Sequence, residues 1–206
     1  MFTGIVQHRG RVEARTETPH GQRLRIDARE WDHRPEPGAS IAVDGCCLTI
    51  AEPRPDGILE FDVITQTLRV TRLGDLDLGS RVNLEAGATP STRLDGHIVQ
   101  GHVDALGIVD SIQDDPEDWR LTVRAPDEGA IFLAERGSIA INGVSLTLAA
   151  VRESLATVAL IPTTLERTNL ETLRPGDRVN LEYDYLARMV VHALRTSGRI
   201  PTSSAG

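Results

Sequence analysis

The sequence predicts an all-β protein made of two similar small domains, followed by a single helix. Three observations support this fold class: an internal repeat that spans most of the chain, short runs with a period of two residues, and one late stretch with helical periodicity. A chain of 206 residues can form one large domain or two small ones, so the repeat decides between them.

The repeat is clearest where residues 40–50 and residues 138–148 share six identical positions out of eleven, with an offset of 98 residues. Further blocks match at an offset of 97 and keep the same order. They are residues 4–6 with 101–103, 10–12 with 107–109, 64–68 with 161–165, and 79–85 with 176–182. This order indicates a duplicated domain, with the first copy in residues 1–96 and the second in residues 97–186.

Short β-strands are expected within each half. Residues 24–26, 58–64 and 119–123 alternate apolar and polar side chains between Pro, Gly and Asp turns. Several short strands at regular spacing are typical of a small barrel or sandwich. Aromatic residues make up only 3% of the chain, so Val, Ile, Leu and Ala must fill the core. A flat ligand would therefore rest on aliphatic side chains.

One helix is expected over residues 185–196, outside both repeats. Apolar side chains recur at helical spacing from Leu186 to Leu194, and Asp184 can cap the first turn. Such a helix either folds back on its own domain or packs against copies of itself in an oligomer, and the pattern leaves both open. Residues 197–206 are expected to be a disordered tail.

The composition excludes several classes of function. The chain carries 22 Lys and Arg against 30 Asp and Glu, a net charge of −8, which argues against nucleic acid as a partner. The N-terminus has no secretory pattern, and no run of about 18 apolar residues occurs, so we expect a cytoplasmic protein. The adjacent Cys46 and Cys47 are expected to be free thiols, and the histidine and cysteine spacing predicts no metal site.

A thiol or hydroxyl precedes a threonine by two residues in both halves, as Cys47 with Thr49 and as Ser145 with Thr147. On a strand such pairs share one face, so they could hydrogen-bond the edge of a heterocycle. Packing in a barrel wall explains them equally well.

Other candidate residues come from a histidine pair and from two hydroxyl-rich stretches. His97 and His102 are five apart and would face opposite sides of a regular strand, which makes them poor co-ligands. His102 takes the place of Ile5 in the other repeat, so it is either a proton shuttle near a ligand or a structural histidine. Residues 63–69 and 161–167 read as strand ends suited to a polyol, or as turn caps.

Five motifs together resemble the riboflavin synthase family with tandem lumazine-binding repeats. They are Met-Phe-Thr-Gly-Ile-Val-Gln at residues 1–7, Gly-Cys-Cys-Leu-Thr at 45–49, Gly-His-Ile-Val-Gln-Gly-His-Val-Asp at 96–104, Gly-Val-Ser-Leu-Thr at 143–147 and Ile-Pro-Thr-Thr-Leu-Glu-Arg-Thr at 161–168. The resemblance covers nearly the whole chain.

The resemblance implies two six-stranded Greek-key barrels and a C-terminal helix that makes a homotrimer. It also implies dismutation of two molecules of 6,7-dimethyl-8-ribityllumazine into riboflavin and 5-amino-6-(D-ribitylamino)uracil, without metal or cofactor. In the family the reacting pockets lie between barrels of neighbouring chains. Lumazine synthase is a candidate partner, and a non-catalytic lumazine or flavin carrier is the alternative function.

The resemblance assigns site residues in both halves, with His102, Cys47, Ser145 and Thr147 as acid–base groups. In the first half the binding residues are Gly4, Ile5, Val6, Cys47, Leu48, Thr49, Asp62, Val63, Ile64, Thr65, Gln66 and Thr67. In the second half they are Gly101, His102, Val103, Arg136, Ser145, Leu146, Thr147, Ala159, Leu160, Ile161, Pro162, Thr163 and Thr164. Arg136 replaces a common lysine and keeps its charge, whereas Asn142 replaces a common aspartate and puts a carboxylate role there in doubt.

Overall fold

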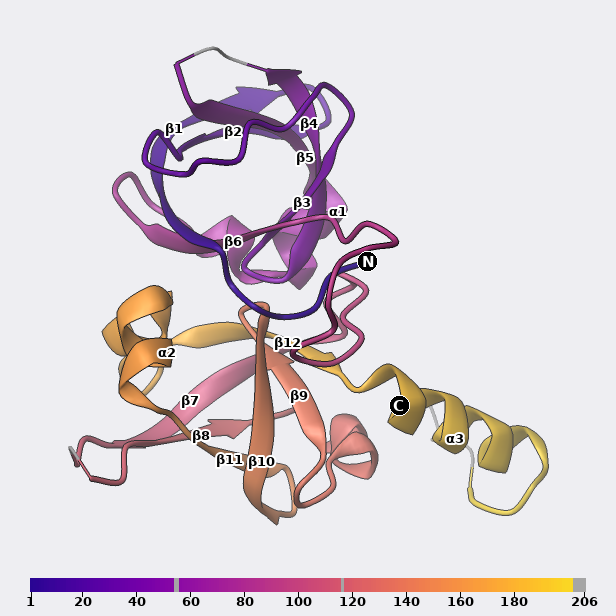
Figure 1. Cartoon of the computed structure of the whole chain (residues 1–206). Coiled ribbons are helices and arrows are strands. Elements are labelled where there is room, and N and C mark those ends of the chain that lie inside the picture. Colours follow the sequence, from indigo (N-terminus) through magenta and orange to yellow (C-terminus); the bar gives the residue numbers. More distant parts are fainter. Residues whose placement is uncertain (54–55, 116, 202–206) are drawn as a thin grey trace.

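The chain forms two closed antiparallel barrels joined by a short connection, with a helix that projects from the second barrel (Figure 1). The computed structural model describes residues 1–53, 56–115 and 117–201. Part of the tail that was expected to be disordered, residues 202–206, lies outside the described residues. Two six-stranded barrels and one C-terminal helix confirm the predicted fold class.

The two barrels have the same Greek-key connectivity. The first follows the order β1-β2-β5-β4-β3-β6, and the second repeats that cycle with β7 to β12. The strands of the first barrel are β1 His8–Thr18, β2 Gly21–Asp27, β3 Ser40–Val43, β4 Cys46–Pro53, β5 Ile58–Ile64 and β6 Arg81–Ala86. Those of the second are β7 Ala105–Gln113, β8 Arg120–Arg124, β9 Ser138–Ile141, β10 Val144–Arg152, β11 Leu155–Ala159 and β12 Arg178–Tyr183. Closure leaves neither barrel with a free sheet edge.

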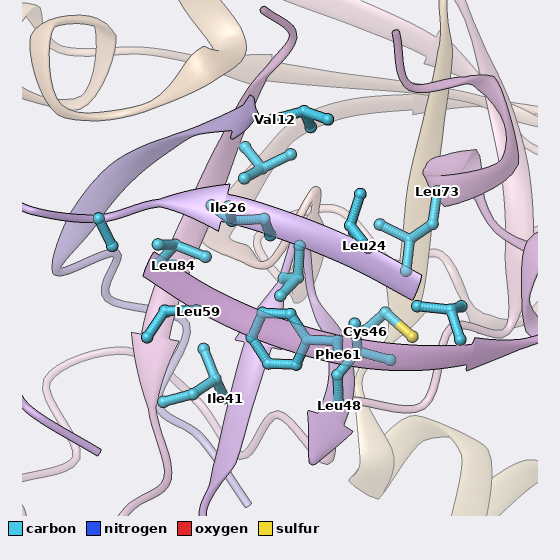
Figure 2. Packing of buried hydrophobic residues seen from close by; sticks show 14 of the residues in the cluster. Val12, Leu24, Ile26, Ile41, Cys46, Leu48, Leu59, Phe61, Leu73 and Leu84 are labelled. Atoms are coloured by element: carbon cyan, nitrogen blue, oxygen red, sulfur yellow. The ribbon is translucent and has the colours of Figure 1, made fainter. Parts of the chain in front are cut away.

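Each barrel has its own hydrophobic core, filled mainly by aliphatic side chains. In the first barrel Phe61 lies among Ile41, Leu59 and Leu84, all of them buried (Figure 2). The matching cluster in the second barrel is built from β7 to β12 and their short helices. Alternate residues of each strand enter these cores, so the intervening residues face outward and are free to bind other groups.

The hydroxyl-rich stretches are short helices rather than strand ends. β5 ends at Ile64 and is followed at once by α1 (Thr65–Val70), and α2 (Pro162–Arg167) begins three residues after β11. Pro162 favours the first helical turn because its φ is already fixed at a helical value. α1 leads into the 3₁₀ turn η1 (Arg72–Asp75), and α2 leads into η3 (Asn169–Thr172). A third 3₁₀ turn, η2 (Asp127–Phe132), follows β8.

A buried polar network joins the two barrels. Asp44 is completely buried, and its carboxylate accepts hydrogen bonds from the backbone N–H of Asn83 at 2.8 Å and from the side chain of Asn169 at 2.8 Å. Arg72 pairs with the same carboxylate. Asn142 is the counterpart of Asp44 in the second repeat and accepts from the backbone N–H of Asn180 at 2.9 Å.

Asn142 therefore belongs to the barrel interface of the chain, where it is as fully buried as Asp44. The sequence left a carboxylate role at this position in doubt. In the structure the carboxylate of the barrel interface is supplied by Asp44, at the equivalent position of the first repeat.

The helix α3 (Tyr185–Thr196) makes few contacts with the barrels. Asp184 caps it by accepting from the backbone N–H groups of Leu186 at 2.7 Å and Ala187 at 3.3 Å. Only Val191 is buried, whereas Leu186 is 63% exposed and Val190 is 58% exposed. The helix projects from the second barrel (Figure 1), and its side chains still contact that barrel, because Arg188 pairs with Asp104 at 3.0 Å and Arg195 lies over the ring of Phe132. Among the described residues, no helix is long and apolar enough to span a membrane.

Candidate functional site

The outward residues of β4 and β10 form two equivalent surface patches. Cys47 is half-buried and Thr49 is exposed on β4, while Leu48 between them enters the first core. Ser145, Thr147 and Leu146 repeat this pattern on β10. The shared face predicted for each thiol or hydroxyl and its threonine is therefore present. Leu48 and Leu146 have side chains in the cores, so they can meet a ligand only through their backbone.

The ends of the neighbouring strands complete these patches. β4 pairs with β5 through Ile50 and Phe61, and β10 pairs with β11 through Leu148 and Val158. In this antiparallel register the next residues along are Asp62 toward Thr49 and Ala159 toward Thr147. β5 continues to Ile64, whereas β11 ends at Ala159. We call the two surfaces the Cys47 patch (Cys47, Thr49 and residues 62–67) and the Ser145 patch (Ser145, Thr147 and residues 159–164).

Both patches offer exposed aliphatic side chains next to hydroxyl groups. Ile64 is 54% exposed and Ile161 is 65% exposed, and exposed threonines follow each of them along the chain. Val63 and Leu160 instead enter the cores. Asp62 forms a two-bond ion pair with Arg23, with both distances at 2.9 Å. An aliphatic platform with hydroxyl groups on its rim suits a flat heterocycle that carries a polyol.

Two segments that precede the barrels lie against these patches, but in exchanged order. The N-terminal segment (residues 2–6) reaches the second barrel at Gly4, whose carbonyl accepts from the backbone N–H of Ser145 at 2.8 Å, while Phe2 packs beside Cys47 and Gly101. The later part of the linker segment (residues 97–103) reaches the first barrel, where the N–H of Cys47 donates to the carbonyl of Gly101 at 2.8 Å, while His97 at its start lies beside Ser145. Val6 packs against the second core and Val103 against the first.

The exchange corrects the grouping expected from the sequence, which joined residues 4–6 to Cys47 and residues 101–103 to Ser145. The contact is close at both glycines. A Cβ on Gly4 would lie 2.6 Å from the Cβ of Ser145, and a Cβ on Gly101 would lie 2.6 Å from that of Cys47. Both glycines also have positive φ, so no other residue fits either place.

His102 is exposed and follows Gly101 in the linker segment, so one chain places it beside the first barrel and not with Ser145 and Thr147. Its backbone N–H donates to Glu182 at 3.0 Å. The sequence had attributed His102 to the second barrel. Arg136 is exposed at the start of the turn before β9, and it forms no ion pair with the residues that the structure describes.

His97 is a site residue that the sequence reasoning missed. Its Nδ1 lies 2.7 Å from the Oγ of Ser145, and its backbone N–H donates to the carbonyl of Thr3 at 3.1 Å. The argument from odd spacing assumed a regular strand, but the linker segment has only an isolated bridge between Phe2 and Val99. The Gly-His pair at residues 96–97 was the available signal, because a glycine permits the close approach to Ser145.

Burial lowers the pKa of His97 below the usual 6.5 of histidine, which favours the neutral ring at pH 7. The ring is 9% exposed, and no atom of the described residues bonds to its buried Nε2. A neutral imidazole beside a serine hydroxyl can accept the hydroxyl proton or donate to its oxygen, according to its tautomer.

This lowered pKa predicts a specific dependence of stability on pH. The unfolded chain protonates His97 before the folded chain does, so the free energy of unfolding should fall as the pH drops below about 6.5. Above that pH the contribution is complete. We expect His97→Gln to have a flatter stability profile between pH 5 and 6.5, measured by urea unfolding.

The control for this measurement is His20→Gln, because His20 is exposed in the turn between β1 and β2. Its profile should follow that of the unmodified protein. Parallel profiles for the His97→Gln variant and the unmodified chain would contradict the buried neutral histidine.

Comparison with known proteins identifies the domains and close relatives. A model of the lumazine binding domain matches residues 3–87 and 100–184. A riboflavin synthase of Mycobacterium tuberculosis (strain ATCC 25618 / H37Rv) is 43% identical over 202 residues, which cover 96% of this chain and all of the relative. That of Escherichia coli (strain K12) is 36% identical and covers 93% of this chain and 90% of the relative.

Solved structures show the same architecture with ligands. The crystal structure of LumP complexed with 6,7-dimethyl-8-(1'-D-ribityl) lumazine superposes with a TM-score of 0.79 at 27% identity, and covers 88% of this chain and 98% of LumP. LumP complexed with riboflavin gives 0.81 at 28% identity, with 89% and 99% covered. On the identity and coverage of its relatives, the chain belongs to the riboflavin synthase family and carries two lumazine-binding domains.

Proposed function

We propose that this chain catalyses the dismutation of two molecules of 6,7-dimethyl-8-ribityllumazine, the last step of riboflavin biosynthesis. A four-carbon unit passes from one molecule to the other, which makes the enzyme a transferase. The products are riboflavin and 5-amino-6-(D-ribitylamino)uracil, and their atoms together equal those of the two substrates. The balance therefore needs no cofactor and no external oxidant. The observation that carries the proposal is that both lumazine-binding barrels keep a polar pair, Cys47 with Thr49 and Ser145 with Thr147.

The chemistry requires two activated lumazines in contact. The C7 methyl group of one must lose a proton, and the other must be activated by addition at C7. Much of this reactivity belongs to the substrate itself, so holding the two rings in register can lower the barrier by several kcal/mol. In this proposal the hydroxyl, thiol and imidazole groups of Ser145, Cys47, His97 and His102 hold the ring edges and move protons, and the contact of His97 with Ser145 supports it.

We propose that the active form is a homotrimer in the cytoplasm. The two patches of one chain are open surfaces, since Thr49, Thr147, Ile64 and Ile161 are all exposed. Two lumazines need a shared, covered space, and a neighbouring chain can bring a Cys47 patch opposite a Ser145 patch. The exposed apolar side chains of α3 provide a contact for that neighbour. Association with lumazine synthase stays a prediction, to be tested by co-sedimentation.

A non-catalytic lumazine or flavin carrier is the second candidate, favoured by the similarity to LumP in its ligand complexes. A carrier needs only one working patch, whereas both patches here keep their polar groups. The experiment is to incubate the purified protein with the lumazine and to follow riboflavin by its absorbance. Riboflavin formation supports the enzyme, and bound lumazine without product supports the carrier.

Two substitutions separate the contributions of the thiol and the imidazole. Cys47→Ser should lower kcat only modestly, because a hydroxyl can replace a thiol as a hydrogen-bond donor. His102→Ala should lower kcat on the order of 10²-fold if the imidazole transfers protons in the slow step. Steady-state rates are measured with lumazine binding checked separately. Unchanged turnover in His102→Ala would remove this imidazole from the mechanism.

A further inference from the structure

Two buried carboxylates hold the exchanged segments, and the mechanism above does not use them. Glu85 on β6 accepts from the backbone N–H and the Oγ of Thr3, both at 2.7 Å, and from the N–H of Gly4 at 2.9 Å. Glu182 on β12 accepts from the N–H groups of Gln100 at 2.5 Å, Gly101 at 2.9 Å and His102 at 3.0 Å. Each carboxylate therefore binds three donors of one segment.

Both side chains occupy the same place in the two repeats and are almost inaccessible, at 4% and 3% exposed. Neither forms an ion pair with Lys or Arg in the described part of the chain. Burial raises the pKa of both carboxyls, and the hydrogen bonds from the segments oppose that rise. A buried carboxylate without a cation is costly unless several donors satisfy it. The three hydrogen bonds that each carboxylate accepts from its segment are therefore the main compensation for the cost of burying it.

Because the segments are exchanged, each of these carboxylates lies in one barrel and holds residues that contact the other barrel. Glu85 belongs to the first barrel, but the segment that it holds lies at Ser145 on the second barrel. Glu182 belongs to the second barrel, but its segment lies at Cys47 on the first. We propose that Glu85 positions residues 3–4 at the Ser145 patch and that Glu182 positions residues 100–102 at the Cys47 patch. The ligand-binding role of the patches rests on the proposed function, whereas the crossed positioning does not.

Cys47 gives a direct readout of the linker segment, because Gly101 covers its backbone and lies against its Cβ. In Glu182→Gln the loss of charge-assisted bonds should loosen that segment and raise the rate of Cys47 alkylation by iodoacetamide roughly tenfold. Glu85→Gln should leave this rate within about twofold of the unmodified chain. Mass spectrometry of the full-length protein locates and quantifies the modified thiol.

The mirror experiment uses a Cys47→Ser/Ser145→Cys background, in which the only half-buried thiol lies beside Gly4. There Glu85→Gln should raise the alkylation rate roughly tenfold, and Glu182→Gln should not. Glu85→Asp and Glu182→Asp keep the carboxylate and should restore part of the protection. Cys46 reports general loosening, since its thiol is buried in the first core. It should stay unmodified in every variant.

Several alkylation results would contradict the crossed positioning by Glu85 and Glu182. An uncrossed pattern, in which Glu85→Gln exposes Cys47, or equal effects of both variants on both thiols, would overturn the crossed positioning. So would unchanged rates at both thiols. Modification of Cys46 together with Cys47 would show a purely structural role, and that too contradicts the proposal. Failure of the proposed function would appear separately, as absence of riboflavin from the unmodified protein, and it would leave the thiol pattern unaffected.

Discussion

Removal of α3 is expected to convert the trimer into monomers and to abolish riboflavin formation. Within one chain Val191 is the only buried residue of α3, so deletion removes little packing beyond the Arg188–Asp104 ion pair and the contact of Arg195 with Phe132. Its exposed Leu186, Met189 and Val190 are the surface proposed to bind neighbouring chains. If the reacting lumazines sit between chains, a monomer holds both half-sites but cannot bring them together. Light scattering gives the mass, and riboflavin absorbance gives the rate.

Point substitutions provide a milder form of the same test. Leu186→Glu with Val190→Glu keeps the helix and places charges on its exposed apolar face. The control variant is Arg199→Glu, at an exposed position beyond the helix. It should remain a trimer with normal activity. An active monomer would disprove the site between chains, and an inactive trimer would show that the helix acts on the pockets instead.

Asp44→Ala is expected to be the most destabilising single substitution at the barrel interface. The carboxylate is completely buried, and it accepts from Asn83 and Asn169 while it pairs with Arg72. Removing one partner of a buried ion pair costs about 3–5 kcal/mol, and we expect the lower part of that range because the Arg72 guanidinium left behind is only partly buried. Urea unfolding followed by circular dichroism measures this loss.

The control for this substitution is Asn142→Ala, at the equivalent position of the second repeat. Asn142 accepts one backbone bond at 2.9 Å and donates one weak bond to Asn169 at 3.4 Å, with no ion pair among the described residues. Its loss should cost about 1–3 kcal/mol, the usual penalty of unsatisfied neutral groups. Equal costs for the two variants would show that the Arg72 pair contributes nothing.

The repeat made the duplicated barrels predictable, because strand periodicity and turn residues recur in both halves. The exchange of segments could not be predicted in the same way. Residues 4–6 and 101–103 are near copies, and so are the strands around Cys47 and Ser145, so both pairings satisfy the same hydrogen bonds. Local sequence patterns do not encode that choice.

The roles of the polar residues of β6 and β12 are a second feature that the sequence could not predict. The sequence matched residues 79–85 with residues 176–182 but gave no reason for the shared Asn and Glu. In the structure Asn83 binds across the barrel interface and Glu85 holds the N-terminal segment. These two partners, Asn169 and Gly4, lie 86 and 81 residues away in the sequence, beyond the range of any local pattern.

The exchanged segments give the chain the internal symmetry of a swapped dimer. Each barrel is completed by an arm that belongs to the other copy, as happens when two identical subunits trade N-terminal arms. A single copy of the repeat that kept this arrangement would need a second copy to supply its arm. Fusion of two copies then made that partnership permanent and independent of concentration. It also freed the two surfaces to diverge, so that one now carries a thiol where the other carries a hydroxyl with a histidine beside it.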